Sequence, residues 1–152
     1  MRLKNFTKQR GKNIFKEKFK GDSMEKRISI PSGTVWESKI GYSRAVRVGN
    51  LIEVSGTSAI DRDRIVTPGD PYQQTRFIIQ KIEKALDEAG GSLSDVVRTR
   101  IYVTNIKDWA AVGRAHGEFF KDIKPVTTMI EVKSLIDPNF VVEIEATAYL
   151  NE

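Results

Sequence analysis

The sequence predicts an α+β fold, in which one mixed sheet carries two helices on a single face. Apolar and polar residues alternate over Phe140–Leu150, which is typical of a half-buried strand. Two other segments, 70–89 and 108–124, repeat apolar residues every three or four positions, as amphipathic helices do. Two helices can cover only one face of a four- or five-stranded sheet, so the other face must meet water or a partner.

The first elements of the predicted domain form a hairpin. Arg44–Val48 and Leu51–Ser55 are rich in β-branched residues, and Gly49-Asn50 between them is a typical two-residue turn. The polar segment Asp61–Asp70 follows and is expected to be a loop.

A helix is predicted to begin after this loop and to pack one side against the sheet. Asp70 suits the N-cap, Pro71 suits the first helical position, and Gly90-Gly91 suits the end. The apolar stripe of this helix consists of Ile78, Ile79, Ile82, Ala85, Leu86 and Ala89.

The strand Val96–Thr104 and a second helix from about Asp108 to Pro125 come next. In the strand, one face is predicted to carry Val97, Thr99, Ile101 and Val103, and the other Arg98, Arg100 and Tyr102. The core side of the helix is predicted to carry Trp109, Val112, His116, Phe119 and Ile123. His116, the only histidine, is therefore interpreted as a packed or interface residue.

The last two strands, Pro125–Val132 and Val142–Ala148, complete the order β-β-α-β-α-β-β and are expected to be neighbours. Glu143 and Glu145 then share one face, with Glu131 opposite them. Carboxylates this close repel one another unless Arg98 and Arg100 neutralise them. Two interpretations remain open, a structural ladder of ion pairs and a functional acid or base.

Composition excludes several classes of chemistry. The 152 residues suit one domain, and the chain has no cysteine, so disulfides, thiol nucleophiles and cysteine metal sites are excluded. One histidine cannot form a multi-histidine metal centre, and we expect no cofactor. No apolar run is long enough to span a membrane, and the absence of cysteine fits a cytoplasmic location.

The net charge of +5 arises from the first residues. Residues 1–23 contain eight lysines and arginines but two acids, whereas residues 24–152 are nearly neutral. We interpret 1–23 as a basic leader or disordered tail, with a targeting or binding arm as the alternative, and 24–152 as the domain. A nearly neutral domain makes nucleic acid an improbable partner.

The half-covered sheet should associate with another copy of itself. The segment Val54–Thr57 at a strand end offers backbone amides to a ligand or is a simple strand exit, and spacing does not separate these interpretations.

Several segments together resemble the YjgF/RidA family, also called the L-PSP endoribonuclease-like family. They occur in family order over most of 24–150: Ile40–Val46, Val54–Thr57, Val96–Thr104, Trp109–Phe120, Pro125–Val132 and Glu143–Ala146. The resemblance implies a chorismate-mutase-like fold and a homotrimer with a central barrel, outer helices and ligand clefts between subunits. Members of this family hydrolyse enamines and imines to ammonia and 2-keto acids.

The resemblance also assigns site residues. Glu143 takes the position of the family's catalytic glutamate, and Tyr42 that of its cleft tyrosine. Thr127 stands where the family has an arginine, and Gly113 where it has an asparagine. An arginine grips a carboxylate with two charge-assisted bonds, whereas a threonine offers one neutral bond. The chain therefore resembles a branch without that arginine.

Two further residues complete the expected cleft. Thr128 is expected to contact the polar end of the ligand with Thr127, and Arg44 is either a replacement cation or a solvated strand arginine. The leading function is an enamine or imine deaminase of altered specificity, acting on a small enamine, imine or keto acid. The alternative is a non-catalytic trimer that binds such a metabolite, and a ribonuclease or translation inhibitor is favoured least.

Overall fold

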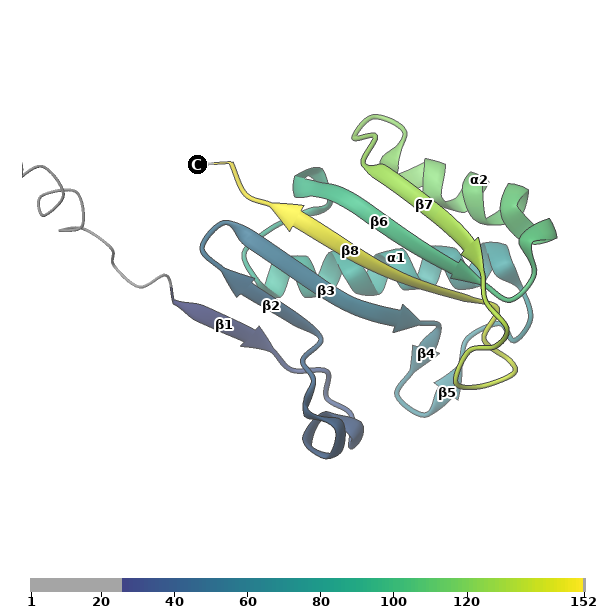
Figure 1. Ribbon diagram of the computed structural model, residues 1–152, viewed down its shortest axis with the longest axis horizontal. Helices are drawn as coiled ribbons and strands as arrows, with labels where there is room; N and C mark the ends of the chain where they lie inside the picture. Colours follow the sequence, from purple (N-terminus) through teal and green to yellow (C-terminus); the bar gives the residue numbers. More distant parts are fainter. Residues whose placement is uncertain (1–25, 152) are drawn as a thin grey trace, which may run out of the picture.

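A computed structural model describes residues 26–151, and the predicted basic tail 1–23 lies outside them. The main strands are β1 (Arg27–Ile30), β2 (Ala45–Val48), β3 (Leu51–Ser58), β6 (Val96–Val103), β7 (Val126–Glu131) and β8 (Val142–Tyr149). They form one mixed sheet in the order β1-β2-β3-β8-β6-β7 (Figure 1). All neighbouring pairs are antiparallel except β6 and β7, which are parallel.

Two helices, α1 (Pro71–Glu88) and α2 (Trp109–Phe120), lie behind the sheet in the view of Figure 1 and cover a single face. As the sequence predicted, the Asp70 side chain caps α1 by accepting a 3.0 Å hydrogen bond from the Gln73 amide. Gly90, at φ +83°, follows its last turn. The α+β architecture with two helices on one face is therefore confirmed.

Short elements connect these parts. They are the π-helical turn η1 (Glu37–Gly41), the 3-10 turns η2 (Leu93–Asp95) and η3 (Ile106–Asp108), and the small hairpin of β4 (Ile60–Asp61) and β5 (Arg64–Ile65). Within residues 26–151, no helix is long and apolar enough to cross a bilayer.

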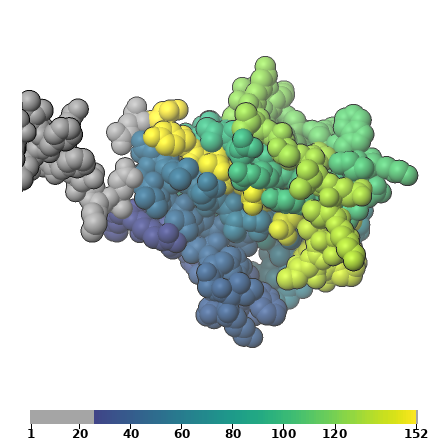
Figure 2. Space-filling model, viewed as in Figure 1, coloured from purple at the N-terminus to yellow at the C-terminus, as the bar shows by residue number. Residues whose placement is uncertain are grey.

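The core lies between the sheet and the helices. The α1 stripe predicted from the sequence is buried throughout. On β8, Val142, Ile144, Ala146 and Ala148 face this core, so Glu143, Glu145, Thr147 and Tyr149 occupy the open face of the sheet. Figure 2 looks onto that open face, which no element of residues 26–151 covers.

Three sequence predictions about the sheet are wrong. The sheet has six strands, because β1 adds an edge strand beside β2, and the segment 61–70 contains parts of a small hairpin. The strands β7 and β8 are not neighbours, because β6 lies between them. The end of α2 and the turn after it place β7 parallel to β6, a long-range pairing that alternation along one strand does not encode.

Two predicted core residues are exposed. Val97 is 47% exposed because an irregularity in the β6–β8 pairing between Val96 and Arg98 puts Val96 into the core instead. Trp109 is 62% exposed at the first turn of α2, whereas Val112 is fully buried.

Candidate functional site

The strand β3 contains a bulge that shapes the surroundings of Glu143. Its register with β8 shifts between Val54 and Thr57, so Gly56 falls inside the irregularity. Beyond it, Ser58 pairs with Glu143 and donates a 2.8 Å hydrogen bond from Oγ to Oε2. A Cβ atom on Gly56 would overlap the Glu143 carboxylate. Glycine at this position therefore makes room for the acid.

The two glutamates of β8 have different partners. Glu145 accepts a 2.9 Å hydrogen bond from Arg100, with which it forms an ion pair, and a 3.2 Å hydrogen bond from the Tyr102 hydroxyl. Burial and the adjacent Glu145 charge raise the pKa of Tyr102 and keep its hydroxyl protonated. No cation among residues 26–151 lies within ion-pair distance of Glu143. Glu143 is thus the carboxylate that remains available to a ligand.

Arg44 lies at the same bulge. Its Nη1 atom donates to the Ser55 hydroxyl at 3.2 Å, the Gly56 carbonyl at 3.2 Å and the Thr57 hydroxyl at 3.1 Å. These three bonds hold the guanidinium against the bulge. We call Arg44, Ser55, Gly56, Ser58 and Glu143 the bulge site.

Lys81 supports the bulge site from α1. Its ammonium group donates to the Ile60 carbonyl at 2.7 Å and to the Ser58 carbonyl at 3.4 Å, just beyond the bulge. Burial, reinforced by the positive charge of Arg44, lowers the pKa of Lys81 to about 8. The ammonium therefore ties the exit of β3 to the helix layer.

A second cluster lies at the other end of the strand order. Thr127 on β7 places its Oγ1 2.9 Å from Oγ1 of Thr99, which in turn lies 3.0 Å from Nε2 of His116 on α2. Gly113, one helical turn before His116, is exposed, and a Cβ there would meet no atom within 4 Å. Burial lowers the pKa of His116. We call Gly113, His116, Thr99 and Thr127 the edge site.

The two sites do not meet within one protomer. The strands β8 and β6 separate β3 from β7, and Glu143 lies on the open face whereas Thr127 points to the helix side. Thr128 pairs with Arg100 and therefore lies on the open face, away from Thr127. A cleft containing both Glu143 and Thr127 needs residues of two protomers.

The remaining predicted residue, Tyr42, directly follows η1. Its hydroxyl lies 3.0 Å from the Thr34 hydroxyl and forms no described hydrogen bond with Glu143 or Thr127. This contact joins the residues on either side of η1.

Comparison with known proteins identifies the family. Residues 35–150 match the family model described as Endoribonuclease L-PSP. The chain belongs to the YjgF family. A crystal structure of a YjgF/YER057c/UK114 family member from Mycobacterium tuberculosis is 49% identical, superposes with a TM-score of 0.75, and covers 82% of this chain and all of that one.

Two curated relatives are also similar to this chain over most of their length. A RutC family protein of Pyrococcus abyssi is 38% identical over 71% of this chain and 85% of its own length. An uncharacterized protein of Streptomyces coelicolor is 39% identical over 79% of this chain and 90% of its own length. The six-stranded mixed sheet with two helices matches the solved YjgF structures.

Sequence reasoning located parts of this candidate site and missed others. Arg100 neutralises Glu145 as expected. Glu131 does not lie opposite Glu143, since β7 is two strands away from β8, and its carboxylate accepts a 2.7 Å bond from the Ile106 amide. Ser58 and Lys81 were missed. Gly56 inside a strand pattern was the signal for the bulge, beyond which Ser58 bonds Glu143 and Lys81 holds the end of β3.

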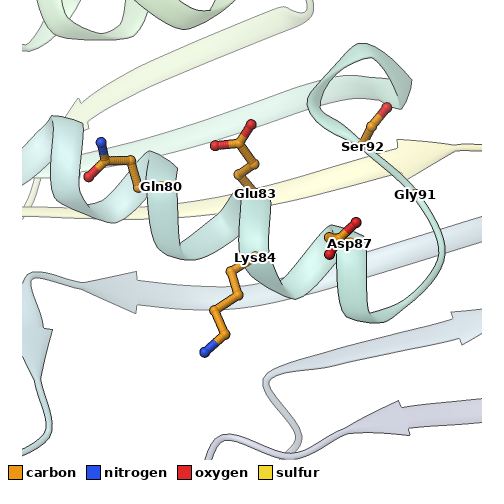
Figure 3. Close-up of a pocket in the computed structure, with 6 residues that line it drawn as sticks. All are labelled: Gln80, Glu83, Lys84, Asp87, Gly91 and Ser92. Atoms are coloured by element: carbon orange, nitrogen blue, oxygen red, sulfur yellow. The ribbon is translucent and has the colours of Figure 1, made fainter.

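One hollow on the protomer lies away from the residues of the bulge site and the edge site. It has a volume of about 410 Å³ and runs along α1 (Figure 3). Its lining is Gln80, Glu83, Lys84, Asp87, Gly91 and Ser92. In the view of Figure 3, the Lys84 side chain points away from those of Gln80 and Glu83. Within residues 26–151, no group of three acidic or histidine side chains is placed to bind a metal ion.

Proposed function

We propose that this YjgF-family chain forms a homotrimer and hydrolyses a small enamine or imine in clefts between protomers. Glu143 carries the proposal because, unlike Glu145 on the same strand and face, it has no ion pair among residues 26–151, and Ser58 holds it beside a glycine that leaves it space. The bulge site of one protomer and the edge site of the next would form the two walls of each cleft.

The chemistry needs one base and one water molecule. Glu143 takes a proton from water, the oxygen attacks the carbon of the C=N bond, and the nitrogen gains the protons needed to leave as ammonia. The carbon keeps the water oxygen and becomes a carbonyl, so an imine and water give a ketone and ammonia. Arg44, held at the bulge by its bond to the Gly56 carbonyl, would supply positive charge to the ligand.

Altered specificity follows from Thr127 and Gly113. Neither side chain carries a charge, so the edge site cannot clamp a carboxylate as a bidentate arginine does. The same observation favours the second candidate, a trimer that holds such a metabolite without reacting with it.

Ammonia release from a panel of enamines and imines tests the proposal. Glu143→Gln should reduce kcat by about 10²- to 10⁴-fold, the usual contribution of a general base. Glu145→Gln, on the same strand and face but already paired with Arg100, is the matched control. Equal rates in wild type and Glu143→Gln would exclude this mechanism, and ligand-induced stabilisation without ammonia release would favour the binding trimer.

A further inference from the structure

The edge site contains a chain of hydrogen bonds whose direction can be deduced. Thr127 Oγ1 donates to the Pro125 carbonyl at 3.2 Å, and a carbonyl oxygen can only accept. A threonine hydroxyl has one hydrogen, so while Thr127 donates to Pro125 it accepts from Thr99 in the 2.9 Å bond between them.

The single hydroxyl hydrogen of Thr99 also bears on the tautomer of His116. Thr99 uses its single hydrogen on Thr127, and it is fully buried, so no water can rearrange its bonds. Its 3.0 Å contact with Nε2 of His116 must then be donated by the imidazole. Burial lowers the pKa of His116 and so disfavours the charged form, and this arrangement of bonds requires a neutral ring with its hydrogen on Nε2.

We propose that His116 and Thr99 are positioning residues that make Thr127 a hydrogen-bond donor to a neutral carbonyl oxygen of the ligand. The proposal rests on the proposed inter-subunit cleft and specifies the group that the cleft binds at this end. A ligand carbonyl would replace the Pro125 carbonyl as acceptor, a small change because that bond is long and exposed. If Thr127 instead donated its hydrogen to Thr99, it would have none left to donate to a ligand.

The edge site should prefer a neutral ligand group, because it contains no cation to pair with a carboxylate. Among residues 26–151, no arginine or lysine donates to Thr127 or Thr99. A carboxylate placed there would lose water without gaining an opposite charge, whereas an amide or ketone oxygen needs only the hydrogen that Thr127 offers.

The single histidine allows a direct test of the polarity by ¹⁵N NMR of the imidazole at pH 7. The Nε2–H tautomer is expected in the wild type. Thr99→Val should change the tautomer ratio, and Thr99→Ser should restore it, because serine returns the hydroxyl. A wild-type ring protonated on Nδ1 would overturn the proposal.

Titration with pyruvamide and pyruvate tests the ligand class, with the His116 resonance as the signal and Glu143→Gln as the background to prevent turnover. Pyruvamide should bind more tightly than pyruvate, and Thr127→Val should weaken it about three- to tenfold, the effect of one neutral hydrogen bond. Thr128→Val is the comparison: because Thr128 lies on the opposite face of β7, this variant should weaken pyruvamide binding less than Thr127→Val does.

Each contrary result has a distinct meaning. Tighter binding of pyruvate, equal effects of the two threonine variants, or no binding of pyruvamide would overturn the proposal. Pyruvamide binding through Thr127 in a chain that never releases ammonia would refute the deaminase and leave the positioning role intact.

Discussion

Ser58 Oγ donates a 2.8 Å hydrogen bond to Glu143 Oε2 across the β3–β8 pair, and this bond exists only because the bulge brings the two side chains to the same face. The carboxylate is thus held at the strand end by a neutral donor, while the neighbouring Glu145 is held by a cation.

Gly56→Ala should displace this carboxylate. The added methyl group overlaps Glu143, whose flexible end must move, so we expect kcat to fall on the order of 10- to 100-fold with little change in Tm. Ser58→Ala removes the hydrogen bond without the overlap and should cost less activity. Full activity in Gly56→Ala would show that the position of the Glu143 carboxylate is unimportant.

Two glycine substitutions should change stability in opposite directions. Gly113 is an exposed residue of α2, and a Cβ there would meet no atom within 4 Å. Gly113→Ala should therefore stabilise the protein by about 0.5–1 kcal/mol through helix propensity. Gly90 adopts φ +83°, so Gly90→Ala should destabilise it by about 1–2 kcal/mol. Urea unfolding of both variants measures this. Loss of stability in Gly113→Ala would contradict the open space at that position.

Stability should depend on pH through His116. Its pKa is lowered by burial in the folded state and lies near 6.5 when the chain is unfolded. The unfolded state therefore binds more protons below pH 6.5, so the contribution is complete above that pH and is lost as pH falls through the folded-state value.

Urea unfolding between pH 5 and 8 checks this dependence against His116→Gln, which keeps an amide donor for Thr99 but does not titrate. The variant should show a flatter profile across that range. If the unfolding free energies of wild type and variant changed in parallel with pH, the imidazole would have the same pKa in the folded and unfolded states.

The open sheet face should hold the protomers together. Val48, Leu51 and Tyr149 lie in one register row and are 37%, 40% and 52% exposed, which is unusual for a surface left in water. Wild type should sediment as three chains, and Leu51→Lys with Tyr149→Lys should weaken association by about 1–3 kcal/mol for each side chain. Ile136→Lys, in a loop at 86% exposure, is the control. A wild-type monomer at all concentrations would remove the proposed clefts.

Local signals in the sequence were sufficient for much of the fold. The α1 cap at Asp70, the turn at Gly49 and the alternation of β8 depend on neighbours within a few residues, and all three were predicted correctly. The position of β7 beside β6 depends on long-range pairing and was not.

The candidate site was harder to predict for the same reason. Glu143 and Arg44 could be named individually, but the bulge that joins them depends on the pairing of β3 with β8. Thr127 was named from family position alone, and its connection through Thr99 to His116 appears only when β6, β7 and α2 are in place.

The bulge also makes the number of residues in β3 critical. Before it, even-numbered positions such as Ile52 and Val54 enter the core; after it, Thr57 does, because one additional residue inverts the alternation. If the same residues paired without the bulge, Thr57 would come to lie opposite Glu143 and Ser58 would turn inward, leaving Glu143 without its donor. The bulge therefore determines which side chain of β3 lies beside the Glu143 carboxylate.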